Sequence, residues 1–158
     1  MLKMLYRIFV KTRAGSVGAN LHVNGFSLVS KTTYLGDNVN FNGIRISGSG
    51  VVSIGNNFHS GKDCLIISQN HNYDTGNAIP YDDTYISKDV TIKDNVWLGD
   101  RVIVLGGVSI GEGAIIQAGS VVTSDIPDLA IAGGHPAVVF KKRDEIHYYE
   151  LKKMGKYF

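Results

Sequence analysis

The sequence predicts an all-β protein built as a parallel β-helix of short repeats. Aliphatic residues recur every six positions, at Ile86, Ile92, Leu98, Val104, Ile110, Ile116 and Val122. Four positions after each comes a second ladder, mostly of small or β-branched residues: Val90, Val96, Val102, Val108, Ala114, Ser120 and Ile126. Neither the 3.6-residue helical period nor simple strand alternation gives this spacing, whereas a repeated short strand and turn does. Three such hexads make a triangular coil of about 18 residues.

Both ladders are expected to face the inside of the coil and to stack from one coil to the next. This stacking predicts three columns: Ile86 over Val104 over Val122, Ile92 over Ile110, and Leu98 over Ile116. The cadence also runs upstream, at Leu35, Phe41, Ile54, Ser60 and Ile66. The 19 glycines and 3 prolines fit a chain with many tight bends.

The 158 residues fit a single domain, 1–158. We expect an N-terminal cap at 1–29, the β-helix coils at 30–134 with a histidine-bearing loop at 68–84, and a tail and α-helix at 135–158. The start of the cap is expected to be a short amphipathic helix or strand, with loose attachment to a membrane surface as the alternative.

The final segment has the signals of a helix that begins at an acidic cap and stops at a glycine. Asp144 can cap a helix through residues 145–154, and Gly155 is a suitable stop. An apolar stripe on this helix is expected to cover the open end of the coil stack.

Composition restricts the partners and the compartment. Lys and Arg number 16 against 14 Asp and Glu, so no global field favours nucleic acid or an anionic membrane. Residues 103–122 are as long as a membrane span, but their repeat period and Glu112 favour a coil, so we expect no stable membrane insertion. The single cysteine, Cys64, makes no internal disulfide and fits the reducing cytoplasm.

A polar stretch interrupts the apolar cadence at residues 65–85, LIISQNHNYDTGNAIPYDDTY. Ile66 and Ile86 are 20 positions apart, two more than one coil. We therefore expect a coil whose corner loops outward and carries His71 to the surface. Imidazole is suited to act as a base near neutral pH.

A long C-terminal stretch carries a family resemblance. Residues 96–143 read VWLGDRVIVLGGVSIGEGAIIQAGSVVTSDIPDLAIAGGHPAVVFKKR. Together with IGNNFHSG and SQNHNYD upstream, this stretch resembles the hexapeptide-repeat acyltransferases, which include galactoside, maltose, serine and xenobiotic acetyltransferases and polysaccharide O-acetyltransferases. The resemblance implies a left-handed coil, a homotrimer with active sites between neighbouring coils, acetyl-CoA as co-substrate, and no metal.

The resemblance also assigns roles to particular residues. It implies that His71 is the general base, and His59 is kept as an alternative residue of the acceptor site. The orienting or acceptor-binding partners of His71 are sought among Asn70, Asn72, Tyr73, Asp74 and Asp83, with Asp63 and Asp82 also open. For coenzyme A it implies Trp97, Ala118, Thr123, Lys141 and Lys142, with Arg143 completing the basic run. Gly99, Gly106 and Gly107 are added because small residues let the pantetheine arm approach the strand edges.

The function expected from the sequence is transfer of acetyl from acetyl-CoA to a carbohydrate hydroxyl, in capsule, O-antigen or other surface-polysaccharide biosynthesis. One alternative is N-acetylation of an amino-sugar nucleotide, and another is a non-catalytic β-helix that binds a partner. A zinc hydratase with this type of coil would need three histidine ligands, and no H-x4-H pair lies near His71.

Overall fold

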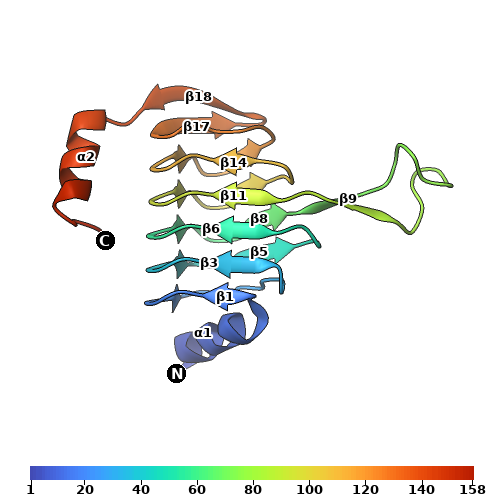
Figure 1. Ribbon diagram of the computed structural model, residues 1–158, viewed down its shortest axis with the longest axis horizontal. Helices are drawn as coiled ribbons and strands as arrows, with labels where there is room; N and C mark the ends of the chain where they lie inside the picture. Colours follow the sequence, from blue (N-terminus) through green and yellow to red (C-terminus); the bar gives the residue numbers. More distant parts are fainter.

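The computed structural model describes residues 1–158, and it forms a prism of stacked coils with a helix near each end of the chain (Figure 1). Three sheets make the faces of the prism, and their strands are parallel except for the last strand of the second sheet. The first sheet contains β1 (Ser16–Val17), β3 (Thr33–Leu35), β6 (Val52–Ile54), β11 (Val90–Ile92) and β14 (Ser109–Ile110).

The second and third sheets complete each turn of the coil. The second contains β2 (His22–Val23), β4 (Asn40–Phe41), β7 (His59–Ser60), β12 (Trp97–Leu98), β15 (Ile115–Ile116), β17 (Ala130–Gly134) and β18 (Ala137–Lys142). The third contains β5 (Ile44–Ser47), β8 (Cys64–Ile67), β13 (Ile103–Val104) and β16 (Val121–Val122). The chain visits the first, second and third sheets in turn, so each coil hydrogen-bonds to the coils before and after it.

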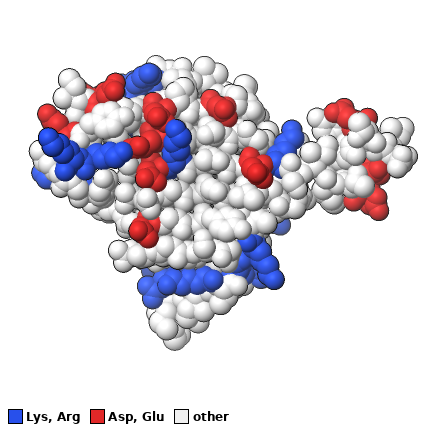
Figure 2. All heavy atoms as spheres, in the orientation of Figure 1, with Lys and Arg blue, Asp and Glu red and all other residues white.

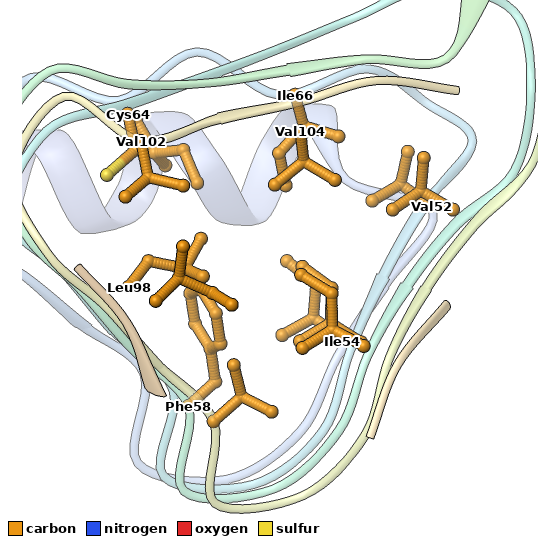
Figure 3. Packing of buried hydrophobic residues seen from close by; sticks show 14 of the residues in the cluster. Val52, Ile54, Phe58, Cys64, Ile66, Leu98, Val102 and Val104 are labelled. Carbon is orange, nitrogen blue, oxygen red and sulfur yellow. The ribbon is translucent and has the colours of Figure 1, made fainter. Parts of the chain in front are cut away.

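The core is a column of aliphatic side chains along the prism axis. Twenty-nine buried residues form one cluster, and Figure 3 shows Ile54, Ile66, Leu98 and Val104 pointing inward from different faces. Each fully buried aliphatic side chain contributes roughly 1.5–3 kcal/mol. Because every coil buries its apolar groups against its neighbours, the stack is stabilised mainly by nearest-neighbour contact.

The predicted ladders are confirmed, with one exception. Every member of the second ladder is buried, and so is the first ladder from Ile92 to Val122. The columns that join Ile92 to Ile110, Leu98 to Ile116 and Val104 to Val122 are all present. Ile86 is the exception.

The assignment of Ile86 to the core was wrong because the chain at that point is outside the coil. Ile86 lies on β10 (Tyr85–Ser87), is 39% exposed and pairs with Asn70. The residue that pairs with Val104 is Ile66, 38 positions earlier, whereas Val104 and Val122 are 18 positions apart. The coil is therefore a regular one with 20 extra residues, and the extra residues form the projecting loop.

The N-terminal segment contains a helix followed by coils that start before residue 30. Helix α1 (Leu2–Arg13) contributes one buried side chain, Val10, to the core. Strands β1 and β2 already pair with β3 and β4 in the regular parallel pattern. The helix therefore covers the end of the stack, and residues 16–29 belong to the coils.

The far end of the stack is closed by a strand instead of the expected helix. Strand β18 folds back antiparallel onto β17. Helix α2 (Glu145–Lys153) begins as predicted, because the Asp144 side chain accepts a hydrogen bond from the His147 backbone N–H. It then runs beside the coils and does not cover their end (Figure 1).

The corner beside α2 carries a ladder of asparagines, which we call the asparagine corner: Asn38, Asn57 and Asn95. Their amides are hydrogen-bonded from coil to coil, and all three have positive φ. Asn95 also donates to the Tyr148 hydroxyl of α2. The ladder thus fixes both the turn of each coil and the position of the helix.

We expect the two isoleucines that the repeat places on one ladder to differ sharply in their effect on stability. Ile92→Ala should lower the free energy of unfolding by about 2–5 kcal/mol, since Ile92 is buried in the column. Ile86→Ala should change it by less than about 0.5 kcal/mol. Urea unfolding followed by circular dichroism measures both, and equal losses would contradict the assignment of Ile86 to the loop.

Candidate active site

The projecting loop leaves and re-enters the prism at one corner, which we call the loop corner: residues 48–51, 68–89, 105–108 and 123–125. Its neck is closed by a hydrogen bond from the Lys88 N–H to the Ser68 carbonyl, at 2.8 Å. A side chain at Gly50 or Gly106 would collide with Lys88, from the coils on either side. Both glycines are therefore needed for the neck to fit between regular coils.

Beyond the neck the loop begins as a two-stranded antiparallel ribbon, β9 (Gln69–His71) and β10 (Figure 1). Its register sets Tyr85 opposite His71 and Ser87 opposite Gln69. The Gln69 side chain accepts a hydrogen bond from the Ser49 N–H, and the Ser49 and Ser87 hydroxyls are 2.6 Å apart. These contacts anchor the ribbon to the coil below it.

His71 is held between two tyrosine rings. The Tyr81 ring is stacked on the imidazole with centroids 3.7 Å apart, and the Tyr85 ring lies 4.4 Å away. The Nδ1 atom of His71 is buried and has no hydrogen-bond partner within the chain. A buried polar atom left unpaired costs about 1–3 kcal/mol, so the Nδ1 atom is an unsatisfied polar group within the loop.

An open hollow lies beside the imidazole. Its walls come from the third sheet, the loop corner and both strands of the ribbon, and they are Ser47, Gly48, Ile67, Gln69, Asn70, His71, Tyr73 and Tyr85. Of the predicted site residues, the structure thus brings Asn70, His71 and Tyr73 together.

The remaining polar residues of the loop act mainly on the loop itself. Asn72 accepts hydrogen bonds from the backbone and hydroxyl of Thr75. Asp82 accepts from the Thr84 hydroxyl and from the N–H groups of Asn77 and Thr84, and these bonds lower the pKa of its carboxyl. Neither these residues nor Asp74 and Asp83 hydrogen-bond to His71. Within one chain the imidazole is therefore positioned by aromatic rings and by no carboxylate.

Sequence reasoning did not single out Tyr85 or Gln69 as site residues. The six-residue spacing predicted that the neighbouring residue Ile86 lies in the core, and the pairing of β9 with β10 was therefore not predicted. The signal that could have revealed it is two short polar segments of equal length on either side of a turn-rich stretch. Antiparallel pairing of these segments would have set an aromatic ring opposite His71.

The residues expected to bind coenzyme A are divided among different parts of the prism. Gly106, Gly107 and Thr123 lie at the loop corner. Trp97 lies on β12 of the second sheet, whereas Gly99 and Ala118 lie at the corner between the second and third sheets. One chain alone therefore does not gather them around His71.

Two of these glycines are required by the coil whatever else they contact. A Cβ on Gly99 would lie 2.5 Å from the backbone nitrogen of Ala118, and a Cβ on Gly106 would lie 2.6 Å from the Lys88 side chain. Gly107 differs, because nothing lies within 4 Å of its Cβ position and its positive φ of 91° explains the residue. Coil packing and backbone conformation thus account for all three.

The three basic residues at positions 141–143 also differ in their surroundings. Lys141 and Lys142 are exposed on β18, at the edge of the second sheet. Arg143 instead donates a hydrogen bond to the Gly113 carbonyl and lies over the Tyr148 ring. Two of the three cations are therefore free to meet an anionic ligand, and the third holds α2.

A second groove, of about 430 Å³, runs between the second sheet and α2. Trp97, His59 and Ile115 line it from the coils, and Leu151, Lys152 and Phe158 contribute from the C-terminal segment. The His59 ring lies 5.6 Å from the Phe158 ring, and burial lowers its pKa. His59 therefore belongs to a different part of the molecule from His71.

Other chemistry is poorly supported by the arrangement of side chains. Burial raises the pKa of the Cys64 thiol, which is 2% exposed and has the Gly99 carbonyl 3.2 Å from its sulfur. A protonated, buried thiol is a poor nucleophile, so Cys64 serves packing. No group of three or more His, Cys, Asp or Glu side chains is placed to hold a metal ion.

Helix α2 is expected to leave the groove at alkaline pH. Glu112 accepts hydrogen bonds from the Tyr148 hydroxyl and the Lys152 ammonium group. Burial and this bond raise the pKa of Tyr148, and the bond raises that of Lys152. Both groups are ordinarily protonated below about pH 10, so their stabilisation is complete there and is lost as the pH rises through the raised values.

Trp97, the only tryptophan, lines the groove and can report this change. Its emission maximum should move to longer wavelength as the pH rises above about 10. Glu112→Gln weakens the shared acceptor, so this variant should show the shift already at pH 8. An emission maximum that stays constant in both proteins would contradict the proposal that Glu112, Tyr148 and Lys152 hold α2 in place.

Comparison with known proteins agrees with this architecture. Residues 89–124 match the bacterial transferase hexapeptide (six repeats) family. Galactoside O-acetyltransferase of Lactococcus lactis is 55% identical over 56 residues, which are 35% of this chain and 27% of that protein. The enzyme of the same name from Escherichia coli is 41% identical over 68 residues, or 41% of this chain and 34% of that protein. The chain thus matches well under two-thirds of the length of either relative.

Solved structures are similar over most of the chain. A hexapeptide-repeat acetyltransferase of Vibrio cholerae, in complex with acetyl coenzyme A, has a TM-score of 0.78 at 26% identity and covers 91% of this chain and 80% of its own. A galactoside acetyltransferase in complex with coenzyme A has a TM-score of 0.76 at 29% identity and covers 88% and 70%. The six-residue cadence, the stacked triangular coils and these matches together show that the chain belongs to the hexapeptide-repeat transferase family.

Proposed function

We propose that this chain transfers the acetyl group of acetyl-CoA to a hydroxyl of a carbohydrate, with His71 as the general base. The observation that carries the proposal is the His71 site itself. It combines an imidazole, two aromatic walls and an adjoining hollow. The related structures with bound acetyl-CoA or coenzyme A support the choice of donor.

The reaction requires a single proton transfer at the attacking oxygen. The acceptor oxygen attacks the thioester carbonyl carbon while a ring nitrogen of His71 takes the hydroxyl proton. The carbon–sulfur bond then breaks, and the proton passes to the departing thiolate. Since the side chain of Cys64 is buried and protonated, no acyl-enzyme is needed, and transfer occurs directly between the two substrates.

Aromatic side chains around His71 fit a sugar acceptor. Tyr73 and Tyr85 are exposed and line the hollow. Their flat apolar faces suit the C–H face of a sugar ring, and Asn70 beside them offers both a donor and an acceptor for hydroxyl groups. We place this acceptor in capsule, O-antigen or other surface-polysaccharide biosynthesis, in the cytoplasm.

The residues expected to bind coenzyme A lie on different parts of one chain, which supports a homotrimer. If the loop of one copy lay against the second sheet of the next, His71 would face the Trp97 region of its neighbour. Lys141 and Lys142 would then bind the phosphates of coenzyme A.

Substitution of the proposed base tests the mechanism. His71→Ala should lower kcat/KM by about a hundredfold or more, since general-base removal typically costs that much. His147→Ala, which changes an exposed histidine on α2, should leave the rate unchanged. Thiol release from acetyl-CoA is measured over sugars, oligosaccharides and sugar nucleotides, with coenzyme A binding and trimer formation checked in each variant.

The outcomes separate the possible functions. Unimpaired turnover in His71→Ala would show that the base lies elsewhere. Activity only on amino-sugar nucleotides would replace the hydroxyl acceptor by an amine. Failure of the wild-type chain to bind any acyl-CoA would leave a non-catalytic binding module.

The basic strand edge gives a separate prediction. Lys141→Gln/Lys142→Gln should raise KM for acetyl-CoA by about tenfold or more with little change in kcat, because charge-assisted hydrogen bonds to phosphate contribute about 1.5–3 kcal/mol. Lys31→Gln, at the opposite end of the coil, is the control. A fall in kcat with KM unchanged would contradict a phosphate-binding role.

A further inference from the structure

Helix α1 buries one face and leaves a second apolar face uncovered. Tyr6, Phe9 and Val10 face the coil, where Phe26 packs against the two aromatic rings. The uncovered face consists of Met1, Met4, Leu5 and Ile8, which are 104%, 59%, 55% and 45% exposed. Their spacing of three, four and seven positions from Met1 places them in one stripe along the helix.

A basic stripe lies beside the apolar one. Lys3, Arg7 and Lys11 follow one another at intervals of four, so their side chains share one side of the helix. Lys3 and Arg7 also line a hollow with Met1, Met4 and residues 21–24. Figure 2 shows blue basic side chains gathered next to an uncharged tip at this end of the molecule.

The charge at this end has a single sign. Residues 1–36 contain no Asp or Glu, whereas they contain Lys3, Arg7, Lys11, Arg13 and Lys31. A second copy docked through the same face would bring these cations together without a counter-charge. An anionic phospholipid surface offers negative charge to the cations and an apolar layer to the exposed stripe.

We propose that α1 docks the chain on the surface of an anionic phospholipid bilayer. Met1, Met4, Leu5 and Ile8 enter the boundary of the acyl chains, and Lys3, Arg7 and Lys11 contact the headgroup phosphates. The 12-residue helix is about 18 Å long, shorter than the roughly 30 Å hydrocarbon core, so it lies in the interface. No helix in the structure has the length and apolarity needed to span a bilayer.

This inference is independent of the acetyl-transfer proposal. The docking end is the end of the coil stack, whereas the His71 loop projects from its side (Figure 1). A docked chain would therefore keep the loop accessible above the bilayer.

Sedimentation of the full chain with phospholipid vesicles tests the proposal. At low salt we expect binding to phosphatidylcholine vesicles that contain about 30% phosphatidylserine, and little binding to pure phosphatidylcholine. Lys3→Gln/Arg7→Gln/Lys11→Gln should weaken binding by about a hundredfold, since each cation near an anionic surface contributes about fivefold. Lys62→Gln/Arg101→Gln/Lys153→Gln removes the same charge elsewhere and should bind like the wild type.

The apolar stripe is tested separately. Met4→Gln/Ile8→Gln changes only exposed side chains, so it should fold normally by circular dichroism and still lose vesicle binding by tenfold or more. Equal binding by the two triple variants, or no wild-type binding to the anionic vesicles, would overturn the proposal. Concentration-dependent self-association abolished by Met4→Gln/Ile8→Gln, without vesicle binding, would assign the stripe to a second copy.

Discussion

Register between successive coils governs how this chain folds. Each short strand satisfies its backbone groups only through the coils before and after it, and each apolar side chain is buried only by its counterparts in the same column. A shift by one position would turn every inward residue outward. Insertions are therefore tolerated only where they leave and return at the same corner.

The His71 loop satisfies this condition. Ser68 and Lys88 close its neck with a backbone hydrogen bond, and the coil resumes at β11 in the register it left at β8. The rigid stack therefore presents a ribbon that carries no share of the core. Because the ribbon lies outside the core column, it can hold His71 between Tyr81 and Tyr85 without disturbing the coils.

The candidate site, the groove beside α2 and the N-terminal helix lie on different parts of the coil stack. The imidazole lies at the loop corner, the groove around Trp97 lies on the second sheet, and α1 covers one end. Helix α2 is tied to the asparagine corner through Tyr148 and Glu112. Within one chain the hollow beside His71 and the groove beside Trp97 are therefore separate.

Local periodicity and residue chemistry are enough to predict the coil, the buried ladders from Val90 to Ile126 and the helix cap at Asp144. Four features emerge only in the folded chain: Ile66 and not Ile86 lies under Val104, Tyr85 faces His71, β18 pairs with β17, and Arg143 holds α2. Each of these depends on contacts between residues far apart in the chain. A six-residue period can continue by chance through a loop, and sequence spacing cannot show at which residue the chain has left the prism.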